Sequence, residues 1–162
     1  MKQKITAWMG VDPGKTGAYA LLSEYGELSI HPWPKSDNHH KVYIHLRKII
    51  RMHDIKFCVI EKVASVSGQG VTSVFTFGKN YGAWKMLLAA LNIKHLKMTP
   101  TAWQKGIITK TDGPDPKSRV KNVATELFGR THFFGPRGGY KDGYGDAALM
   151  AYRAKLMDTG GM

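Results

Sequence analysis

Three short apolar runs, separated by tight turns, open the chain and restrict its possible folds more than any other feature. They cover Ile5–Val11, Gly17–Ser23 and Glu27–Trp33, and the turns between them are Asp12-Pro13-Gly14 and Glu24-Tyr25-Gly26. Apolar runs of this length that end on turn-forming residues are typical of β-strands. Because short turns join antiparallel neighbours, this region predicts a three-stranded antiparallel meander.

The rest of the chain alternates between helical and strand-like spacing. From Asp37 to Met52 apolar residues recur every three or four positions, with basic residues between them, which indicates a helix. The further expected elements are a strand at Lys56–Glu61, a loop at Ala64–Ser73, a helix at Phe75–Leu91, a strand at Ile93–Met98, a short helix begun by Thr99 and Pro100, a loop at Thr109–Pro116, a helix at Lys117–Phe128, a loop at Gly129–Gly145 and a helix at Asp146–Met157. This order predicts one α/β domain over residues 1–162, with a mixed five-stranded sheet (three antiparallel strands plus two parallel) flanked by helices.

The charge balance indicates an anionic partner. The chain has 24 lysines and arginines against 12 acidic residues, a formal charge of +12, and its basic residues are spread from Lys2 to Lys155. This favours a folded surface that binds nucleic acid, although basic ribosomal-type proteins share the profile and composition does not separate DNA from RNA. The chain has a single cysteine, Cys58, and no apolar run near the ~20 residues of a membrane span, so we expect an intracellular, cytoplasmic protein without disulfides or membrane attachment.

The segment GVDPGKTG, residues 10–17, resembles the end of a phosphate-binding P-loop. That motif requires a glycine five positions before the Gly-Lys pair, where this chain has Met9. It also requires a helix after the lysine, and only about eight residues separate Thr16 from the next turn. We therefore expect a turn followed by a strand here, and no nucleotide cofactor.

Acidic residues occur where predicted core strands end. Asp12 follows the first strand and Glu61 closes the fourth; if these strands are neighbours, ~4.8 Å apart, their carboxylates meet. Asp142 and Asp146 flank the start of the last helix and would share one face if helical geometry extends back to Asp142. Each has a structural alternative: Asp12 as a turn residue, Glu61 as a solvated strand end and Asp146 as a helix N-cap.

A cluster of carboxylates has a chemical consequence. Like charges raise one another's proton affinity unless a cation neutralises them. Oxygen ligands without cysteine or a clear histidine pair indicate Mg²⁺ or Mn²⁺. Two such ions ~4 Å apart could activate a water and stabilise the leaving oxygen of a phosphodiester. Together with the basic surface, the acids predict a nuclease.

Three motifs carry a resemblance to a known family. GVDPGKTGAYALL, VIEKV and DGYGDAALMAY, in this order, resemble the RuvC family of Holliday junction resolvases, which has the ribonuclease H-like fold. The middle stretch MTPTAWQKGI…DPKSRVKNVATELFG resembles the phage-type (bacteriophage) branch of that family. The resemblance implies that Asp12, Glu61, Asp142 and Asp146 are catalytic acids that bind two Mg²⁺ ions, and that Lys117 lies near the scissile phosphate. The family's fourth ligand usually lies three residues before the last aspartate, where this chain has Gly143 and carries its acid at Asp142 instead.

The resemblance also implies a partner and a quaternary structure. A homodimer would cut opposite strands of a four-way junction, leaving 5′-phosphate and 3′-hydroxyl ends, with its interface in the helix around Gly78–Gly82. In bacterial relatives an aromatic residue soon after the strand-four glutamate probes the crossover. Here Val63-Ala64-Ser65 stands there, with Phe75 and Phe77 only further on, so no cleavage-sequence preference is inferred.

The remaining expectations concern DNA contacts. Tyr140 and Tyr144 could stack on bases or pack their own loop. Basic residues expected to bind DNA, each of which could also be a solvated charge, are Lys15, Lys79, Lys110, Lys117, Arg119, Lys121, Arg137 and Lys141. The sequence thus predicts a Mg²⁺-dependent endonuclease that resolves four-way and other branched DNA. The alternatives are another ribonuclease H-like nuclease, acting on RNA–DNA hybrids or flaps, and a non-catalytic module that binds branched DNA.

Overall fold

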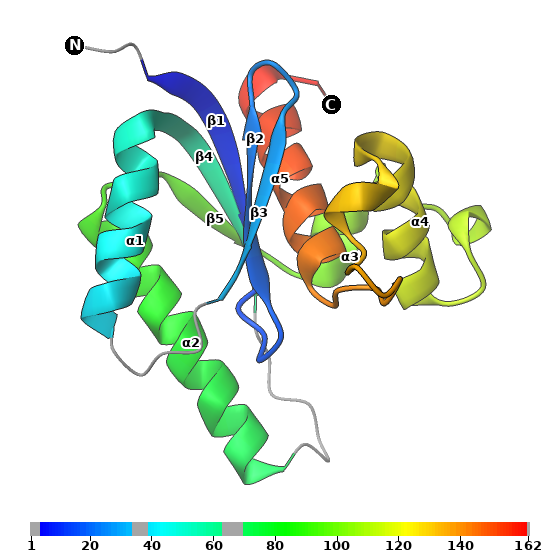
Figure 1. Cartoon of the computed structure of the whole chain (residues 1–162), viewed down its shortest axis with the longest axis horizontal. Helices are drawn as coiled ribbons and strands as arrows, with labels where there is room; N and C mark the ends of the chain where they lie inside the picture. The colour runs from blue at the N-terminus through cyan, green and yellow to red at the C-terminus, as the bar shows by residue number, and fades with distance from the viewer. Residues whose placement is uncertain (1–3, 34–38, 63–69, 162) are drawn as a thin grey trace.

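A five-stranded mixed sheet forms the centre of the computed structural model, which describes residues 4–33, 39–62 and 70–161. The strand order is β3-β2-β1-β4-β5 (Figure 1). β1 pairs antiparallel with β2 and β2 with β3, whereas β1–β4 and β4–β5 pair in parallel, which confirms the predicted sheet. The strands are β1 Ile5–Val11, β2 Ala18–Ser23, β3 Leu28–Pro32, β4 His53–Glu61 and β5 His95–Met98.

Helices cover both faces of this sheet. α1 and α2 lie on one face, and α5 lies on the other, with α3 and α4 beyond it (Figure 1). The elements are α1 His39–Met52, α2 Val71–Ala90, α3 Pro100–Gln104, α4 Pro116–Phe128 and α5 Tyr144–Thr159, with 3₁₀ turns η1 Lys110–Asp112 and η2 Arg130–His132. Within the described ranges, no helix has the length and apolar character needed to cross a membrane.

Alternation along β1 divides the core into two clusters. Trp8 packs in the cluster with α5, whereas its neighbour Met9 packs in the cluster with α1 and α2. The central strands are thus buried on both faces, which explains why they read as nearly continuous apolar runs. Cys58 of β4 is fully buried, so its thiol is a core residue.

Gly10 determines how closely α5 approaches the sheet. A Cβ atom at this position would lie 2.1 Å from the carbonyl oxygen of Ala147 and 2.3 Å from the backbone nitrogen of Ala151. Both atoms belong to the backbone of α5, so only glycine lets the helix rest directly on β1. This contact places the first turn of α5 beside the end of β1.

Several element boundaries differ from those expected. β4 begins at His53, not Lys56, because it already pairs with β1 from its first residue. α2 begins at Val71, so the last three residues of the loop expected at Ala64–Ser73 are helical; residues 64–69 lie outside the described part of the chain, as does Val63. The loops expected at 109–116 and 129–145 contain η1 and η2, and the latter ends where α5 begins at Tyr144, not Asp146. The short helix is confirmed: the Oγ1 of Thr99 accepts from the backbone nitrogen of Ala102 at 3.3 Å.

Candidate active site

A tight turn between β1 and β2 holds Asp12. Its carboxylate Oδ1 accepts a hydrogen bond from the backbone nitrogen of Gly14 at 2.8 Å, and its own backbone nitrogen donates to the carbonyl of Ala18 at 2.9 Å. A Cβ on Gly17 would lie 2.1 Å from the carbonyl oxygen of Asp12, so the turn requires glycine there. β2 begins immediately afterwards, and the predicted strand after Thr16 is confirmed.

Gly143, at the start of α5, packs closely against this turn. It is the N-cap of α5 with a φ of 79°, and a Cβ there would lie 2.7 Å from Oδ2 of Asp12 and 2.8 Å from the carbonyl oxygen of Thr16. No side chain fits this position, so an acid cannot stand at residue 143 in this backbone conformation. Helical geometry does not extend back to Asp142, so the condition for Asp142 and Asp146 to share one helical face is not met. The alternative of Asp146 as N-cap is wrong, because Asp146 lies inside the first turn of α5.

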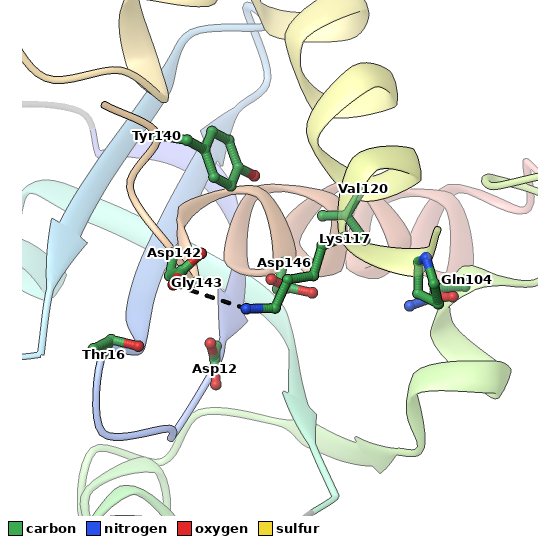
Figure 2. A pocket seen from close by; sticks show the side chains of 10 residues that line it. Asp12, Thr16, Gln104, Lys117, Val120, Tyr140, Asp142, Gly143 and Asp146 are labelled. Carbon is green, nitrogen blue, oxygen red and sulfur yellow. Dashed lines mark ion pairs between the residues drawn. The ribbon is translucent and has the colours of Figure 1, made fainter. Parts of the chain in front are cut away.

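Asp12, in the β1–β2 turn, and Asp142 and Asp146, at the start of α5, face one cleft of about 260 Å³ (Figure 2). The Nζ of Lys117, on the first turn of α4, lies 3.9 Å from Oδ2 of Asp142, and both side chains are largely exposed, at 86% and 59%. The residues that line the cleft are Asp12, Thr16, Gln104, Pro116, Lys117, Val120, Tyr140, Asp142, Gly143 and Asp146. The structure therefore brings together four of the five predicted catalytic residues.

Burial and mutual repulsion change the acidity of the central carboxylates. Burial raises the pKa of Asp12 to about 6, with the Gly14 N–H opposing the rise and the charges of Glu61 and Asp142 adding to it. Burial likewise raises the pKa of Asp146 to about 6, with further contributions from the charges of Asp12 and Asp142. Each of these groups ionises more readily when a cation is nearby.

Glu61 reaches the same neighbourhood from the end of β4, although it does not line the cleft. Its Oε2 accepts a hydrogen bond from the indole nitrogen of Trp103 at 2.9 Å. Burial raises the pKa of Glu61, the Trp103 bond opposes that rise, and the charge of Asp146 adds to it. Trp103 was not singled out in the sequence, although its position in a capped helix directly after β5 was predicted.

The donor set fits a hard divalent cation. In the positions shown, no group of three or more His, Cys, Asp or Glu side chains among the described residues is arranged to hold a metal ion. The chemistry nevertheless matches, because Asp12, Glu61 and Asp146 are carboxylates, partly buried and close enough to raise one another's pKa.

The predicted DNA-binding residues are distributed unevenly. Lys15 is exposed in the turn next to Asp12, while Lys141 lies beside Asp142 with its Nζ 4.9 Å from the ring centre of Tyr144. Lys110 and Arg137 are exposed on η1 and the following loops, Lys121 is half-buried on α4, and Lys79 is exposed on α2. Arg119 has a structural contact, because its Nε donates to the carbonyl of Gly113 at 2.8 Å.

Aromatic residues near the cleft pack within the loop before α5 and against the β1–β2 turn. Tyr140 packs its ring edge-on against Phe134 at 5.5 Å, and these two residues form an isolated β-bridge. Burial raises the pKa of Tyr140 to about 12, so its hydroxyl stays protonated. Of the two alternatives for Tyr140, the structure supports packing of the loop. Phe77 of α2 reaches the β1–β2 turn, where its Cε2 would lie 3.5 Å from a Cβ on Gly14.

Comparisons with known proteins identify the fold. No protein-family model matches the sequence, and no curated protein is significantly similar to it. Among solved structures, Thermus thermophilus RuvC in complex with a Holliday junction substrate superimposes with a TM-score of 0.61 at 9% identity, covering 98% of this chain and 97% of that one. A second Thermus thermophilus RuvC structure gives 0.57 at 11% identity over 96% of both chains. The yeast mitochondrial Holliday junction resolvase Ydc2 gives 0.47 at 13% identity, over 96% of this chain and 81% of that one.

Identities this low establish architecture alone. The order of strands and helices agrees with the predicted ribonuclease H-like domain, whereas the phage-type branch stays a prediction. The chain has a RuvC-like fold.

Proposed function

We propose that the chain is a Mg²⁺-dependent endonuclease that resolves four-way junctions and other branched DNA, as a phage-type member of the resolvases. The observation that carries this proposal is the grouping of Asp12, Asp142 and Asp146 in one cleft with Lys117, on a fold shared with a RuvC that was solved bound to a Holliday junction substrate. The formal charge of +12 supports a nucleic-acid partner. Residues 1–162 would form one nuclease domain.

The acids would act as metal ligands. Asp12, Glu61, Asp142 and Asp146 would hold Mg²⁺, with Mn²⁺ as a substitute and two ions as the expected number. When bound, such ions activate a water and stabilise the leaving oxygen at a phosphodiester. The pKa values near 6 of Asp12 and Asp146 mean that both are largely ionised at neutral pH and available as ligands.

Lys117 would contact the phosphate. Its side chain is 86% exposed and lies at the cleft on the first turn of α4. Figure 2 shows it extending over the cleft toward Asp142, with Asp146 beside its stem and Asp12 below. An ammonium in this position can donate to a phosphate oxygen and stabilise charge that develops there. Lys15, three residues after Asp12, and Lys141, directly before Asp142, would hold the flanking DNA backbone.

The exposed face of α2 would join two copies of the chain. Val71 is 86% exposed, Phe75 73% and Met86 69%, and Gly78 and Gly82 have open space where a Cβ would be. At 100° per residue these five positions fall on one stripe of the helix, apolar at its ends and small in the middle. Such a stripe lets two helices approach closely, and a two-fold dimer would present two clefts to the two strands of a junction.

Cleavage of a synthetic four-way junction tests the proposal. We expect paired, symmetric nicks with 5′-phosphate ends in Mg²⁺, none in EDTA, and none with Asp12→Asn in Mg²⁺. Asp54→Asn is the matched control, because Asp54 is an exposed acid that pairs with Lys56 near the opposite end of β4 from Glu61. This control should cut like the unmodified protein.

Two other outcomes would overturn the proposal. Tight junction binding without cleavage in Mg²⁺ or Mn²⁺ would identify a non-catalytic binding module. Preferential cutting of an RNA–DNA hybrid or a flap, offered in the same assay, would identify a different ribonuclease H-like nuclease.

A further inference from the structure

We propose that Trp103 is a positioning residue for Glu61: its indole N–H holds one carboxylate oxygen, so that the other is presented to the metal. This inference rests on the proposed function, because it assigns Glu61 as a ligand. It adds a residue from α3, an element to which no catalytic role has been given above. The argument depends on three sets of contacts: those of the indole, those of the Trp103 backbone, and those of a second buried tryptophan.

The indole contact is short and shielded from water. Trp103 is 0% exposed, and its Nε1 donates to Oε2 of Glu61 at 2.9 Å. An indole nitrogen is a donor only, so its partner must supply a lone pair, as an ionised carboxylate does. Hydrogen bonds to a charged acceptor are stronger than neutral ones, and the donor side of this one is fully buried. The bond therefore restrains rotation of the Glu61 carboxylate and leaves Oε1 as the oxygen without a hydrogen-bond partner among the described residues.

The backbone of Trp103 is held from the opposite side by α5. The Nε of Arg153 donates to the carbonyl of Trp103 at 2.9 Å, and a terminal guanidinium nitrogen donates to the carbonyl of Lys105. Carbonyls at the end of a helix lack partners within that helix, so the guanidinium completes α3. Arg153 itself is 1% exposed, which makes a buried arginine bonded to two carbonyls an unusual core residue.

α5 thereby links two of the proposed ligands. Asp146 and Arg153 are seven residues apart on this helix, so they lie two turns from each other on one side. Asp146 faces the cleft directly, whereas Arg153 acts on Glu61 through Trp103. A displacement of α5 would move both carboxylates together.

Trp84 shows that a buried tryptophan in this protein does not need a partner for its N–H. It is also 0% exposed, but it packs on the other face of the sheet, against Trp33 and Tyr19. Its indole nitrogen has no hydrogen-bond partner in the described part of the chain. Trp84 therefore fills space, and it provides a control matched to Trp103 in residue type and burial.

The experiment compares Trp103→Phe with Trp84→Phe in the full chain. Both changes shorten a buried aromatic side chain and remove an indole N–H, but only the first removes a bond to a carboxylate. We expect Mn²⁺ affinity, measured by the electron paramagnetic resonance of free Mn²⁺, to fall at least about tenfold in Trp103→Phe and to stay unchanged in Trp84→Phe. Junction cleavage at limiting Mn²⁺ should follow the same order, and excess Mn²⁺ should restore much of it.

A second measurement needs no substitution at Trp103. In the ¹H–¹⁵N spectrum of the unmodified protein, the indole resonance of Trp103 should shift when Mg²⁺ is added and should move again in Glu61→Gln. The Trp84 indole resonance should change in neither case. This readout decides the proposal if Trp103→Phe fails to fold.

The inference and the proposed function can fail separately. Unchanged Mn²⁺ affinity in Trp103→Phe, or an indole resonance of Trp103 that does not respond to Mg²⁺, overturns the positioning role while junction cleavage stands. An unmodified protein that neither binds Mn²⁺ nor cuts junctions would overturn the proposed function itself.

Discussion

The two faces of the sheet are packed by different means. Toward α1 and α2 the core consists of large side chains such as Trp84 and Leu88, which fill space against the strands. Toward the other face, α5 presents buried alanines at positions 147, 148, 151 and 154, and its backbone touches the sheet at Gly10. The first face tolerates an indole without a hydrogen-bond partner, whereas the second holds a buried arginine bonded to two carbonyls.

This difference follows from where the acids are. Asp146 and Gly143 belong to α5 or its cap, and Asp12 follows the strand on which α5 rests. A helix in backbone contact with a strand has little freedom to slide, because every alternative position creates a clash. The α5 face therefore determines the relative positions of the carboxylates, and the α2 face is available for contact with a partner.

Replacing glycine on each face tests this comparison with the largest expected effect. Gly10→Ala places a methyl group within 2.3 Å of two backbone atoms of α5 and should destabilise the protein by about 3 kcal/mol or more. Gly78→Ala places the same group in open space in the middle of α2 of a single chain, and it should stabilise the monomer by about 1 kcal/mol at protein concentrations too low for two copies to associate. Urea unfolding in EDTA measures both.

The test depends on the two substitutions changing the free energy of unfolding in opposite directions. A Gly10→Ala protein as stable as the original would show that α5 can move away from β1 at little cost. In that case the α5 face would not determine the position of Asp146.

The acids on the α5 face should also make the metal-free protein less stable as the pH rises. The pKa of Asp12 is about 6 in the folded chain and near 3.8 when exposed, so folding favours its protonated form. The resulting stability is fully present below pH 3.8 and is lost as pH rises through 6. Between pH 5 and pH 7.5 we expect Asp12 to account for a loss of about 1–2 kcal/mol.

Asp12→Asn isolates this contribution. In EDTA, the unmodified protein should lose about 1–2 kcal/mol more than Asp12→Asn between pH 5 and 7.5, as measured by urea unfolding at both values. Mg²⁺ should raise the melting temperature of the unmodified protein more at pH 7.5 than at pH 5, because it binds the ionised acids. Equal pH dependence in the two proteins would contradict the burial of Asp12.

The features that were predictable from the sequence are local ones. The apolar run before Asp12 and the one before Glu61 indicate strands by their length and composition, and the parallel β1–β4 pairing brings their ends together. Asp146 follows a glycine-rich segment and precedes an apolar run, so its place at the start of the last helix was predictable, whereas its grouping with Asp12 and Glu61 was implied by the family resemblance. The position of each acid at the end of its own element follows from neighbouring residues alone, whereas the meeting of Asp12 and Glu61 depended on the assumption that their strands are neighbours.

The features that were missed depend on contacts between distant segments. Arg153 bonds to Trp103 across 50 positions, and Trp103 to Glu61 across 42, so no spacing in the sequence connects them. The conformation at Gly143 was missed because the collision with Asp12 appears only once α5 is placed on the sheet. Gly10 did carry a signal, since a glycine inside a strand often marks a close backbone approach.

Lys117 offers the smallest expected effect on stability and separates stability from function at the cleft. Its ion pair with Asp142 is 3.9 Å long and exposed, so Lys117→Met should change the free energy of unfolding by less than about 0.5 kcal/mol. Cleavage of a four-way junction should slow by about 10²-fold or more, because a cation beside the phosphate is lost. Lys56→Met is the control, because Lys56 lies away from the cleft and its Nζ pairs with Oδ2 of Asp54 at a distance of 2.6 Å. This substitution should change neither the free energy of unfolding nor the cleavage rate appreciably. If Lys117→Met cut junctions at the original rate, the acids alone would account for the chemistry of this face, and Lys117 would be a solvated lysine at the start of α4.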